Sequence, residues 1–343
     1  MNSWKENRAL LRTASIGKVA NAFQNYWGYR KAIKEGNGVH PAMPIALSVE
    51  PTTSCNLRCP ECPSGLRSFT RPTGMLDPAL LENLILSMKG TLWYVNLYFQ
   101  GEPMLNPNFF ELVEICKKHN VFVNTSTNGH YLTQENAEKL IESGLDRLIV
   151  SLDGITSEVY KEYRVGGKIE KVLEGVDNLN LARKMTNKPG PATYFQTLLT
   201  SSTEHQVGDI RKLAREKELD GTLFKTMQVN DLSIVSPYLP SNPKYSRYEI
   251  TDKGSLKIRG KQQNECWRMW SSAVITWDGK VVPCCFDKDA THVMGDISKI
   301  GFKEIWNSAP YLSFRKMLFQ DRKNIDICSN CSEGTKVWAN PTD

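Results

Sequence analysis

The stretch IALSVEPTTSCNLRCPEC, residues 45–62, joins a strand-like apolar run to three closely spaced cysteines, Cys55, Cys59 and Cys62. Three thiolates on one short loop can bind three irons of a 4Fe–4S cube and leave the fourth iron open to another ligand. A structural zinc site has four protein ligands, and no fourth Cys or His lies near this loop. The spacing therefore favours an iron–sulfur cluster with one open iron over a closed zinc site.

From residue 45 onward, strand-like and helix-like segments alternate about six times. We predict strands at 45–51, 93–99, 121–128, 146–153, 192–200 and 221–229, and helices at 80–88, 109–119, 134–143, 169–184 and 207–218. Runs such as RLIVSL are nearly continuous in apolar residues, which is typical of parallel strands buried on both faces. The pattern predicts an α/β fold with a partial (β/α)6 TIM-like barrel, because six units cannot close an eight-stranded barrel.

The rest of the chain divides around this barrel. The predicted parts are an N-terminal helical segment at 1–45, the barrel at 46–235, a linker at 236–265, a small C-terminal cysteine-rich domain at 266–335 and a tail at 336–343. The linker is rich in Pro, Ser, Lys and Gly and lacks apolar periodicity, so we expect it to be irregular. The pair Asp278-Gly279 lies between two apolar runs and predicts a hairpin, and residues 302–318 predict one or two helices.

In the N-terminal segment, Ile16, Val19, Phe23 and Trp27 recur at helical spacing, with Arg and Lys residues nearby. One interpretation is a helix whose apolar face packs against the main domain, and we favour it because most amphipathic helices face a core. The alternative is contact with a membrane surface or a partner.

Composition narrows the class of protein. The chain has 343 residues, of which 40% are hydrophobic and 23% charged, as in a globular protein. A net charge of +6 without a dense basic block argues against a nucleic-acid partner. We see neither an eighteen-residue apolar run nor a secretory signal, so we expect a cytoplasmic protein. In that reducing compartment, the grouping of eight of the nine cysteines indicates metal binding rather than disulfides.

A C-x3-C-x2-C loop after the first strand of a partial barrel resembles the radical S-adenosylmethionine (SAM) superfamily. The resemblance implies that the open iron binds the amino and carboxylate groups of SAM. Reduction by a donor such as flavodoxin or ferredoxin would then yield a 5′-deoxyadenosyl radical that abstracts hydrogen from a substrate. Glu61 occupies a position where the family often has an aromatic or Met residue against the adenine.

Polar motifs at the predicted strand ends extend the resemblance. Gln100-Gly101-Glu102-Pro103 is similar to the family's Gly-Gly-Glu-Pro motif, and Gly lets the backbone approach a ligand closely. The resemblance implies SAM contacts from the ends of the second, third and fourth strands and from an Arg that pairs with the SAM carboxylate. The residues concerned are Gly101, Glu102, Pro103, Ser126, Asn128, Ser151, Asp153 and Arg164.

A second cysteine group follows the predicted linker. It contains Cys266, Cys284, Cys328 and Cys331, whose spacing alone suits either a 4Fe–4S cluster or zinc. The group resembles the auxiliary-cluster domains called SPASM and twitch, which implies one auxiliary 4Fe–4S cluster with four Cys ligands. Cys285 is an alternative ligand to Cys284. Cys116 lies in a predicted helix, and we expect it to be a buried core residue without a ligand role.

The resemblance implies an oxidoreductase or modifying enzyme whose auxiliary cluster accepts an electron. We favour a net oxidation or modification of a small molecule such as a sugar or alcohol, because no N-terminal peptide-recognition pattern is seen. The alternatives are a maturase of a ribosomally made peptide or protein side chain, RNA or cofactor-biosynthesis modification, and a non-catalytic metal-binding protein. Candidate catalytic bases are Asp287, Asp289 and His292 after the hairpin.

Overall fold

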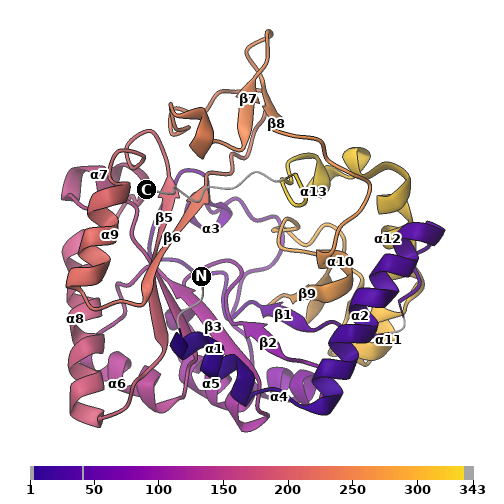
Figure 1. Cartoon of the computed structure of the whole chain (residues 1–343), viewed down its shortest axis with the longest axis horizontal. Helices are drawn as coiled ribbons and strands as arrows, with labels where there is room; N and C mark the ends of the chain where they lie inside the picture. Colours follow the sequence, from indigo (N-terminus) through magenta and orange to yellow (C-terminus); the bar gives the residue numbers. More distant parts are fainter. Residues whose placement is uncertain (1–3, 41, 336–343) are drawn as a thin grey trace.

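The computed structural model describes residues 4–40 and 42–335, and its centre is a nine-stranded sheet (Figure 1). Six strands follow one another in sheet order and pair in parallel. They are β1 Ala46–Val49, β2 Tyr94–Asn96, β3 Phe122–Thr127, β4 Arg147–Ser151, β5 Ala192–Leu199 and β6 Gly221–Thr226. The predicted α/β fold with six parallel strands is confirmed. The predicted tail at 336–343 lies outside the described residues.

Helices between these strands cover the outer face of the curved sheet (Figure 1). They are α4 Pro78–Ser87, α5 Phe109–Lys118, α6 Gln134–Glu142, α8 Ile169–Thr186 and α9 Val207–Glu216. Side-chain caps start several of them: Asp77 accepts from the Ala79 amide, and Thr133 accepts from the Asn136 amide. Cys116, on α5, is fully buried as predicted, and burial raises the pKa of its thiol to about 12.

Two short helices on the loops were not predicted. Helix α3 (Pro63–Leu66) follows the first cysteine group directly, and Pro63 at its first turn fits the fixed φ of proline. Helix α7 (Ser157–Tyr163) begins after Thr156, which accepts a hydrogen bond from the Val159 amide, and ends at Arg164. Helix α3 therefore begins directly after the last cysteine of the first group, Cys62, and helix α7 ends at Arg164.

The C-terminal segment extends the barrel sheet instead of forming a sheet of its own. Strand β9 (Ser272–Ile275) pairs in parallel with β1, with Leu47 opposite Ala273. The predicted hairpin is confirmed: β10 (Lys280–Val282) runs antiparallel to β9 through a turn at Gly279, whose φ is 84°. The remaining elements are α10 Arg268–Ser271, β11 Gly295–Asp296, α11 Phe302–Trp306, α12 Ala309–Asp321, η3 Arg322–Asn324 and α13 Asp326–Ser329.

The segment predicted as an irregular linker carries regular structure. After the 3-10 turn η2 (Pro243–Tyr245), strands β7 (Tyr248–Ile250) and β8 (Leu256–Ile258) form an antiparallel hairpin that projects from the main body (Figure 1). Tyr248 is buried at its base, and Leu256 is buried beside its turn. Most of this segment is irregular as expected, but the hairpin was not predicted, because its short strands carry no apolar periodicity.

The N-terminal segment is helical as predicted, with α1 (Trp4–Arg12) and α2 (Ile16–Glu35). Its expected orientation was wrong: α2 packs through a polar face, because Asn21 and Asn25 donate hydrogen bonds to backbone carbonyls of the main body. The predicted core positions Ile16, Val19, Phe23 and Trp27 are all exposed. Within the described residues, no helix has the length and apolar character that a membrane crossing needs.

Candidate active site and cluster-binding segments

The first cysteine group forms a tight loop between β1 and α3. The Cys62 amide donates to the Cys59 carbonyl at 3.2 Å, and the Leu57 amide points at the Cys55 sulfur at 3.5 Å. Gly65 is required beneath this loop, because a Cβ there would lie 2.5 Å from the Cys59 carbonyl oxygen. Local packing therefore holds the three thiols on one side of the loop, where all three line a cavity of about 300 Å³.

The predicted polar residues at the strand ends line this same cavity. The structure brings Gly101, Glu102, Ser126, Asn128, Ser151, Asp153 and Arg164 to its wall. Pro103 does not reach the wall; it is buried behind Glu102 and starts the 3-10 turn η1 (Pro103–Leu105). Parallel strands end at one edge of the sheet, so side chains distant in sequence meet there.

Gly101 lies where the second strand turns toward the cysteine loop. Its φ is 73°, in the left-handed region, and its amide donates to Ser64 Oγ at 2.9 Å. A Cβ at this position would collide with the carbonyl oxygens of Thr52 and Ser54. Glycine therefore lets the second strand end pack directly against the backbone that leads into the cysteine loop.

Glu102 fixes the shape of the neighbouring loop. Its carboxylate accepts a hydrogen bond from Thr127 Oγ1 at 2.7 Å and another from the Asn128 amide at 2.7 Å. Burial raises the pKa of Glu102, although these hydrogen bonds lower it. In turn, Asn128 Nδ2 donates to Asn56 Oδ1 at 2.7 Å, on the cysteine loop. One buried carboxylate thus joins the second and third strand ends to the thiol loop.

Arg164 is held at the cavity wall by the fourth strand end. Its Nε donates to Asp153 Oδ2 at 2.6 Å, and its Nη1 lies 3.8 Å from the Cys59 sulfur. Burial opposes its charge, but Asp153 and then Cys59 raise the pKa of Arg164. The guanidinium is therefore a fixed cation beside the thiols, with its remaining N–H groups available to an anionic ligand.

Lys225, which the sequence did not single out, also lines the cavity from β6. Its end is open to the cavity, yet the protein around it withdraws it from bulk water, and this desolvation lowers the pKa of Lys225. Among the described residues, no carboxylate forms a salt bridge with it. Tyr98 and Gln196 line the same cavity. The sequence feature that could have identified Lys225 is a lysine within the otherwise largely apolar segment 221–229.

Glu61 departs from the expected aromatic position and makes a different contact. Its Oε2 accepts a hydrogen bond from the Asn230 amide at 2.9 Å. The side chain therefore connects the cysteine loop to the segment that follows β6.

Three cysteines of the second group, Cys266, Cys328 and Cys331, lie near Arg322. This side chain is 1% exposed, and its Nη2 lies 3.4 Å from the Cys331 sulfur. Burial lowers the pKa of Arg322, but Cys266 followed by Cys331 and Cys328 raises it above its usual value. Burial is the main cause that raises the pKa of Cys284. The neighbouring thiols of Cys285, Cys266 and Cys331 raise this pKa further. Cys284 therefore belongs to the electrostatic neighbourhood of the other three thiols.

Cys285 differs from Cys284 in the charges around it. Burial is the main cause of the shifted pKa values of Tyr98 and Lys225, which line the cavity, and the Cys285 thiol raises both of these pKa values. It also raises the pKa of Cys331, although burial contributes more. Cys285 is thus close enough to affect the pKa both of cavity residues and of Cys331 in the second cysteine group.

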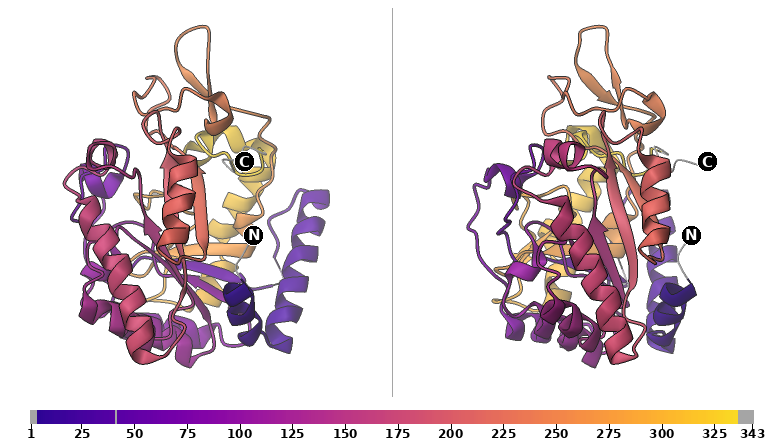
Figure 2. Two further views of the ribbon diagram at one scale, coloured as in Figure 1. Left: turned by 60° about the vertical axis from the view of Figure 1, so that its left-hand side comes forward. Right: turned by 90° about the vertical axis from the view of Figure 1, so that its left-hand side faces the viewer.

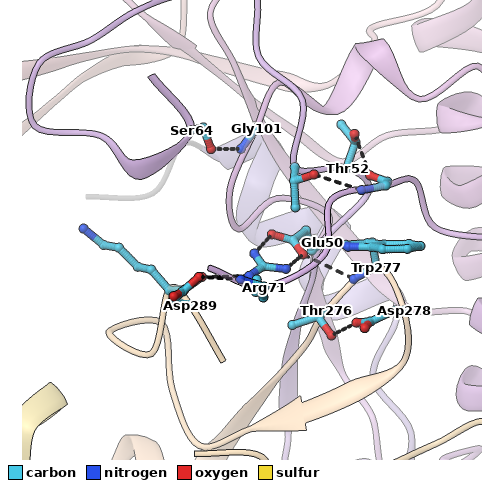
Figure 3. A network of polar contacts seen from close by, with 12 residues as sticks. Glu50, Thr52, Ser64, Arg71, Gly101, Thr276, Trp277, Asp278 and Asp289 are labelled. Atoms are coloured by element: carbon cyan, nitrogen blue, oxygen red, sulfur yellow. Dashed lines mark hydrogen bonds and ion pairs between the residues drawn. The ribbon is translucent and has the colours of Figure 1, made fainter. Parts of the chain in front are cut away.

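The candidate bases lie away from the cavity wall. Asp289 accepts hydrogen bonds from the backbone amides of Arg71 (Figure 3) and Thr70. Asp287 accepts from the amides of Thr291 and His292. His292 Nε2 lies 2.6 Å from Asp326 Oδ1. The structure thus places all three in contacts that shape loops, and none of them lines the cavity.

The thiols suit cluster binding by their chemistry. All nine cysteines are free, and hydrogen-bond donors point at the sulfurs of Cys55, Cys59 and Cys331. Across residues 4–40 and 42–335, no three His, Cys, Asp or Glu side chains converge as ligands of a single metal ion. A four-iron cube is much larger than one ion and takes thiolate ligands that stand farther apart. Both groups therefore fit a cluster in donor type.

Two family models match the chain. The model of the radical SAM superfamily matches residues 49–214, and that of SPASM, an iron–sulfur cluster-binding domain, matches residues 266–332. The first match contains the cysteine loop and four of the cavity-lining strand ends, whereas the second contains the other cysteine group.

Two curated relatives and one solved structure show how far the likeness extends. The tungsten-containing aldehyde ferredoxin oxidoreductase cofactor-modifying protein of Pyrococcus furiosus is 27% identical over 332 residues, which cover 83% of this chain and 86% of that protein. The mycofactocin maturase MftC of Mycobacterium ulcerans is 36% identical over 140 residues, 40% of this chain and 37% of the maturase. The crystal structure of BtrN with AdoMet and 2-DOIA shares the fold, with a TM-score of 0.53, 23% identity and coverage of 85% and 94%.

Proposed function

This chain belongs to the radical SAM superfamily and carries a SPASM domain, and on that premise we propose that it abstracts hydrogen from a small molecule in a net oxidation or modification. Its cofactors are a 4Fe–4S cluster, an auxiliary iron–sulfur cluster and SAM. Once bound and reduced by a donor such as flavodoxin or ferredoxin, the first cluster with SAM supplies a 5′-deoxyadenosyl radical. The observation that carries the proposal is the single cavity shared by three thiols and the polar strand ends.

We assign the SAM-binding cluster to Cys55, Cys59 and Cys62, whose thiols line the cavity without a fourth protein thiol at its wall. The auxiliary cluster is assigned to Cys266, Cys284, Cys328 and Cys331. Cys284 is preferred over Cys285 because it keeps the spacing Gly279-x4-Cys284 that the resemblance implies. The pKa values do not separate the two thiols, since Cys285 affects Cys331 as well as cavity residues.

Within the cavity, the polar residues divide the work of binding SAM. Gly101 lets the second strand end pack directly against the backbone that leads into the cysteine loop, and Glu102 fixes the neighbouring loop by accepting from Thr127 and Asn128. Arg164, oriented by Asp153, offers N–H groups to the SAM carboxylate. This division gives Glu102, whose pKa burial raises, a positioning role through its two hydrogen bonds.

Lys225 is assigned to the substrate. It stands at the cavity wall without a carboxylate partner in the described structure, while Arg164 is already engaged by Asp153. The side chain is exposed to the cavity, so its ammonium can donate hydrogen bonds to an acceptor or an anionic group bound there. We therefore expect the substrate to place an oxygen-rich group, such as a hydroxyl or a carboxylate, against Lys225.

Anaerobic reconstitution tests the proposal. Wild-type protein is expected to hold about eight irons per chain and to form 5′-deoxyadenosine after reduction. Cys55→Ala/Cys59→Ala/Cys62→Ala should lose about four irons and all 5′-deoxyadenosine formation. The matched variant Cys266→Ala/Cys328→Ala/Cys331→Ala should lose about four irons but still cleave SAM. Zinc at the first site, or no SAM cleavage by the wild type, would overturn the assignment.

A peptide side chain is the second candidate substrate, favoured by the sequence likeness to the maturase over 140 residues. The two candidates differ in what stimulates 5′-deoxyadenosine formation. Sugars and small alcohols stimulate it in the first case, and cysteine- or serine-containing peptides stimulate it in the second. The same reconstituted enzyme serves for both panels.

A further inference from the structure

Helix α2 turns its apolar side chains toward solvent. Ile16 is 91% exposed, Phe23 64% and Trp27 55%, and Val19 and Tyr26 are exposed as well. With 3.6 residues per turn, all five positions lie on one face of the helix. Phe23 and Tyr26 both contact the Trp27 ring, so the exposed aromatic side chains form a contiguous group.

Polar contacts fix the opposite face of α2 against the protein. Lys18 Nζ donates to the carbonyls of Thr13 at 2.9 Å and Asn120 at 2.6 Å. Asn25 Nδ2 donates to the Trp270 carbonyl at 2.8 Å. Gly17 packs so closely that a Cβ would lie 2.9 Å from the Gly90 carbonyl oxygen. Rotating α2 to bury its apolar face would leave these buried carbonyls without donors, which is strongly unfavourable.

Helix α1 has the same inverted arrangement. Trp4 is 74% exposed and Leu11 72%, while Glu6 is buried and accepts from Tyr194 Oη at 2.9 Å and Arg147 Nη1 at 3.1 Å. Both helices lie on the outside of the molecule (Figure 2). The outward apolar side chains are therefore a shared property of the N-terminal segment.

Charge on this surface is predominantly positive. The exposed charged residues of α1 and α2 are Arg8, Arg12, Arg30, Lys31, Lys34 and Glu35. The acid lies 3.7 Å from Lys31 and offsets one of the five cations. Exposed aromatic and aliphatic side chains with flanking Arg and Lys are the composition of helices that lie in a membrane interface.

We propose that the exposed face of α1 and α2 docks this protein on the surface of an anionic lipid bilayer. The bilayer accepts Phe23 and Trp27 at the boundary between headgroups and acyl chains, while its negative surface attracts the cations. A second copy of the chain fits this face less well, because like charges would face each other. On the bilayer, the exposed apolar side chains of α1 and α2 would be buried, and their cations would be neutralised by anionic headgroups.

Flotation of reconstituted holoenzyme with vesicles tests the proposal. The wild type should float with phosphatidylcholine vesicles that contain phosphatidylglycerol, and not with phosphatidylcholine alone. Phe23→Ser/Trp27→Ser should bind roughly tenfold or more weakly, and Arg30→Gln/Lys31→Gln/Lys34→Gln should bind weakly and with less dependence on salt. The control Leu181→Ser/Met185→Ser changes two exposed apolar residues at the same spacing on α8 and should bind like wild type.

Three results would overturn the proposal: equal binding to both kinds of vesicle, equal loss in the α8 control, or no binding by the wild type. A dimer in sedimentation that Phe23→Ser/Trp27→Ser converts to a monomer, without vesicle binding, would assign the face to a second copy instead. Thermal melting and 5′-deoxyadenosine formation of each variant show whether the variant is folded, because neither reading depends on lipid.

Discussion

Arg71 and Glu50 form a buried two-point ion pair, with Nη1–Oε2 at 2.7 Å and Nη2–Oε1 at 2.5 Å (Figure 3). Glu50 directly follows β1, and Arg71 lies on the loop after the first cysteine group. Arg71 Nε also donates to the Lys288 carbonyl at 3.0 Å, and Glu50 accepts from the Trp277 amide at 3.3 Å. One ion pair therefore connects the barrel, the first cysteine loop and the hairpin that carries Cys284.

Removing the cation from this pair should be strongly destabilising. Arg71→Met leaves a buried carboxylate without its partner, and we expect the free energy of unfolding to fall by about 3–5 kcal/mol. Burial raises the pKa of Glu50, which Arg71 otherwise lowers. Because protonation then relieves the unpaired charge, the loss should be smaller at acidic pH. Urea denaturation measures both effects.

The exposed pair Lys139–Glu135, with 49% and 75% of the side chains exposed, provides the control. Lys139→Met should have no measurable effect on stability. The double variant Glu50→Gln/Arg71→Met should lose less stability than Arg71→Met alone, since it leaves no buried charge. A double variant as unstable as Arg71→Met would contradict the ion-pair explanation.

Arg164→Lys should weaken SAM binding by about tenfold or more. Lysine keeps the charge but loses the planar fork that Asp153 orients through its bond to Nε at 2.6 Å. Equilibrium dialysis with labelled SAM measures the dissociation constant. Arg58→Lys, at an exposed position on the cysteine loop, is the matched control and should bind like wild type. Equal dissociation constants for all three proteins would remove Arg164 from the SAM site.

Lys225→Met should separate SAM chemistry from substrate chemistry. We expect SAM affinity and substrate-independent 5′-deoxyadenosine formation to stay within about twofold of wild type. Substrate-dependent turnover should fall by roughly thirtyfold or more, as for the loss of a hydrogen bond from a charged group. Lys212→Met on the surface of α9 is the control, with its side chain 70% exposed. Unchanged turnover in Lys225→Met would show that the substrate does not contact this lysine.

His40 should make the protein sensitive to acid. Burial, assisted by Arg315, lowers the pKa of His40 to about 4, although a hydrogen bond with the Trp270 carbonyl opposes this. An unfolded histidine binds its proton near pH 6.5. The unfolded state therefore gains protons first as the pH falls, and stability should decrease by about 2 kcal/mol between pH 7 and pH 5.

The substitution His40→Gln tests this linkage. It should lower stability at pH 7, because the ring is buried, but it should flatten the difference between pH 7 and pH 5. His205→Gln changes an exposed histidine and should keep the wild-type pH dependence. If His40→Gln loses as much stability on acidification as wild type, another group causes the acid sensitivity.

The sequence predicted the features that depend on local pattern. A cysteine spacing and a period of apolar residues are both readable over short windows, and parallel strands bring their ends together wherever they pair. For this reason the sequence alone predicts that Gly101, Ser126 and Ser151 lie close together. Strand β2 was predicted too long, because the chain leaves the sheet after Asn96 to form the cavity wall.

The features that escaped prediction depend on contacts between distant residues. Helix α2 is oriented by side-chain bonds to carbonyls such as that of Trp270, which the helix sequence does not reveal. Asp289 was a plausible base by its position, but its carboxylate caps the loop at Thr70. The position of Lys225 at the cavity follows from the register in which β6 pairs with β5, and the sequence alone does not give this register.

The parallel pairing of β1 with β9 has a consequence for how the chain folds as it is made. Strand β9 leaves the ribosome roughly 220 residues after β1, which at about 5–20 residues per second takes on the order of tens of seconds. Until then, one edge of the nascent barrel has unpaired backbone groups that can pair with strands of other chains. A fragment that stops before Ser272 would therefore keep β1 as an open edge of the sheet.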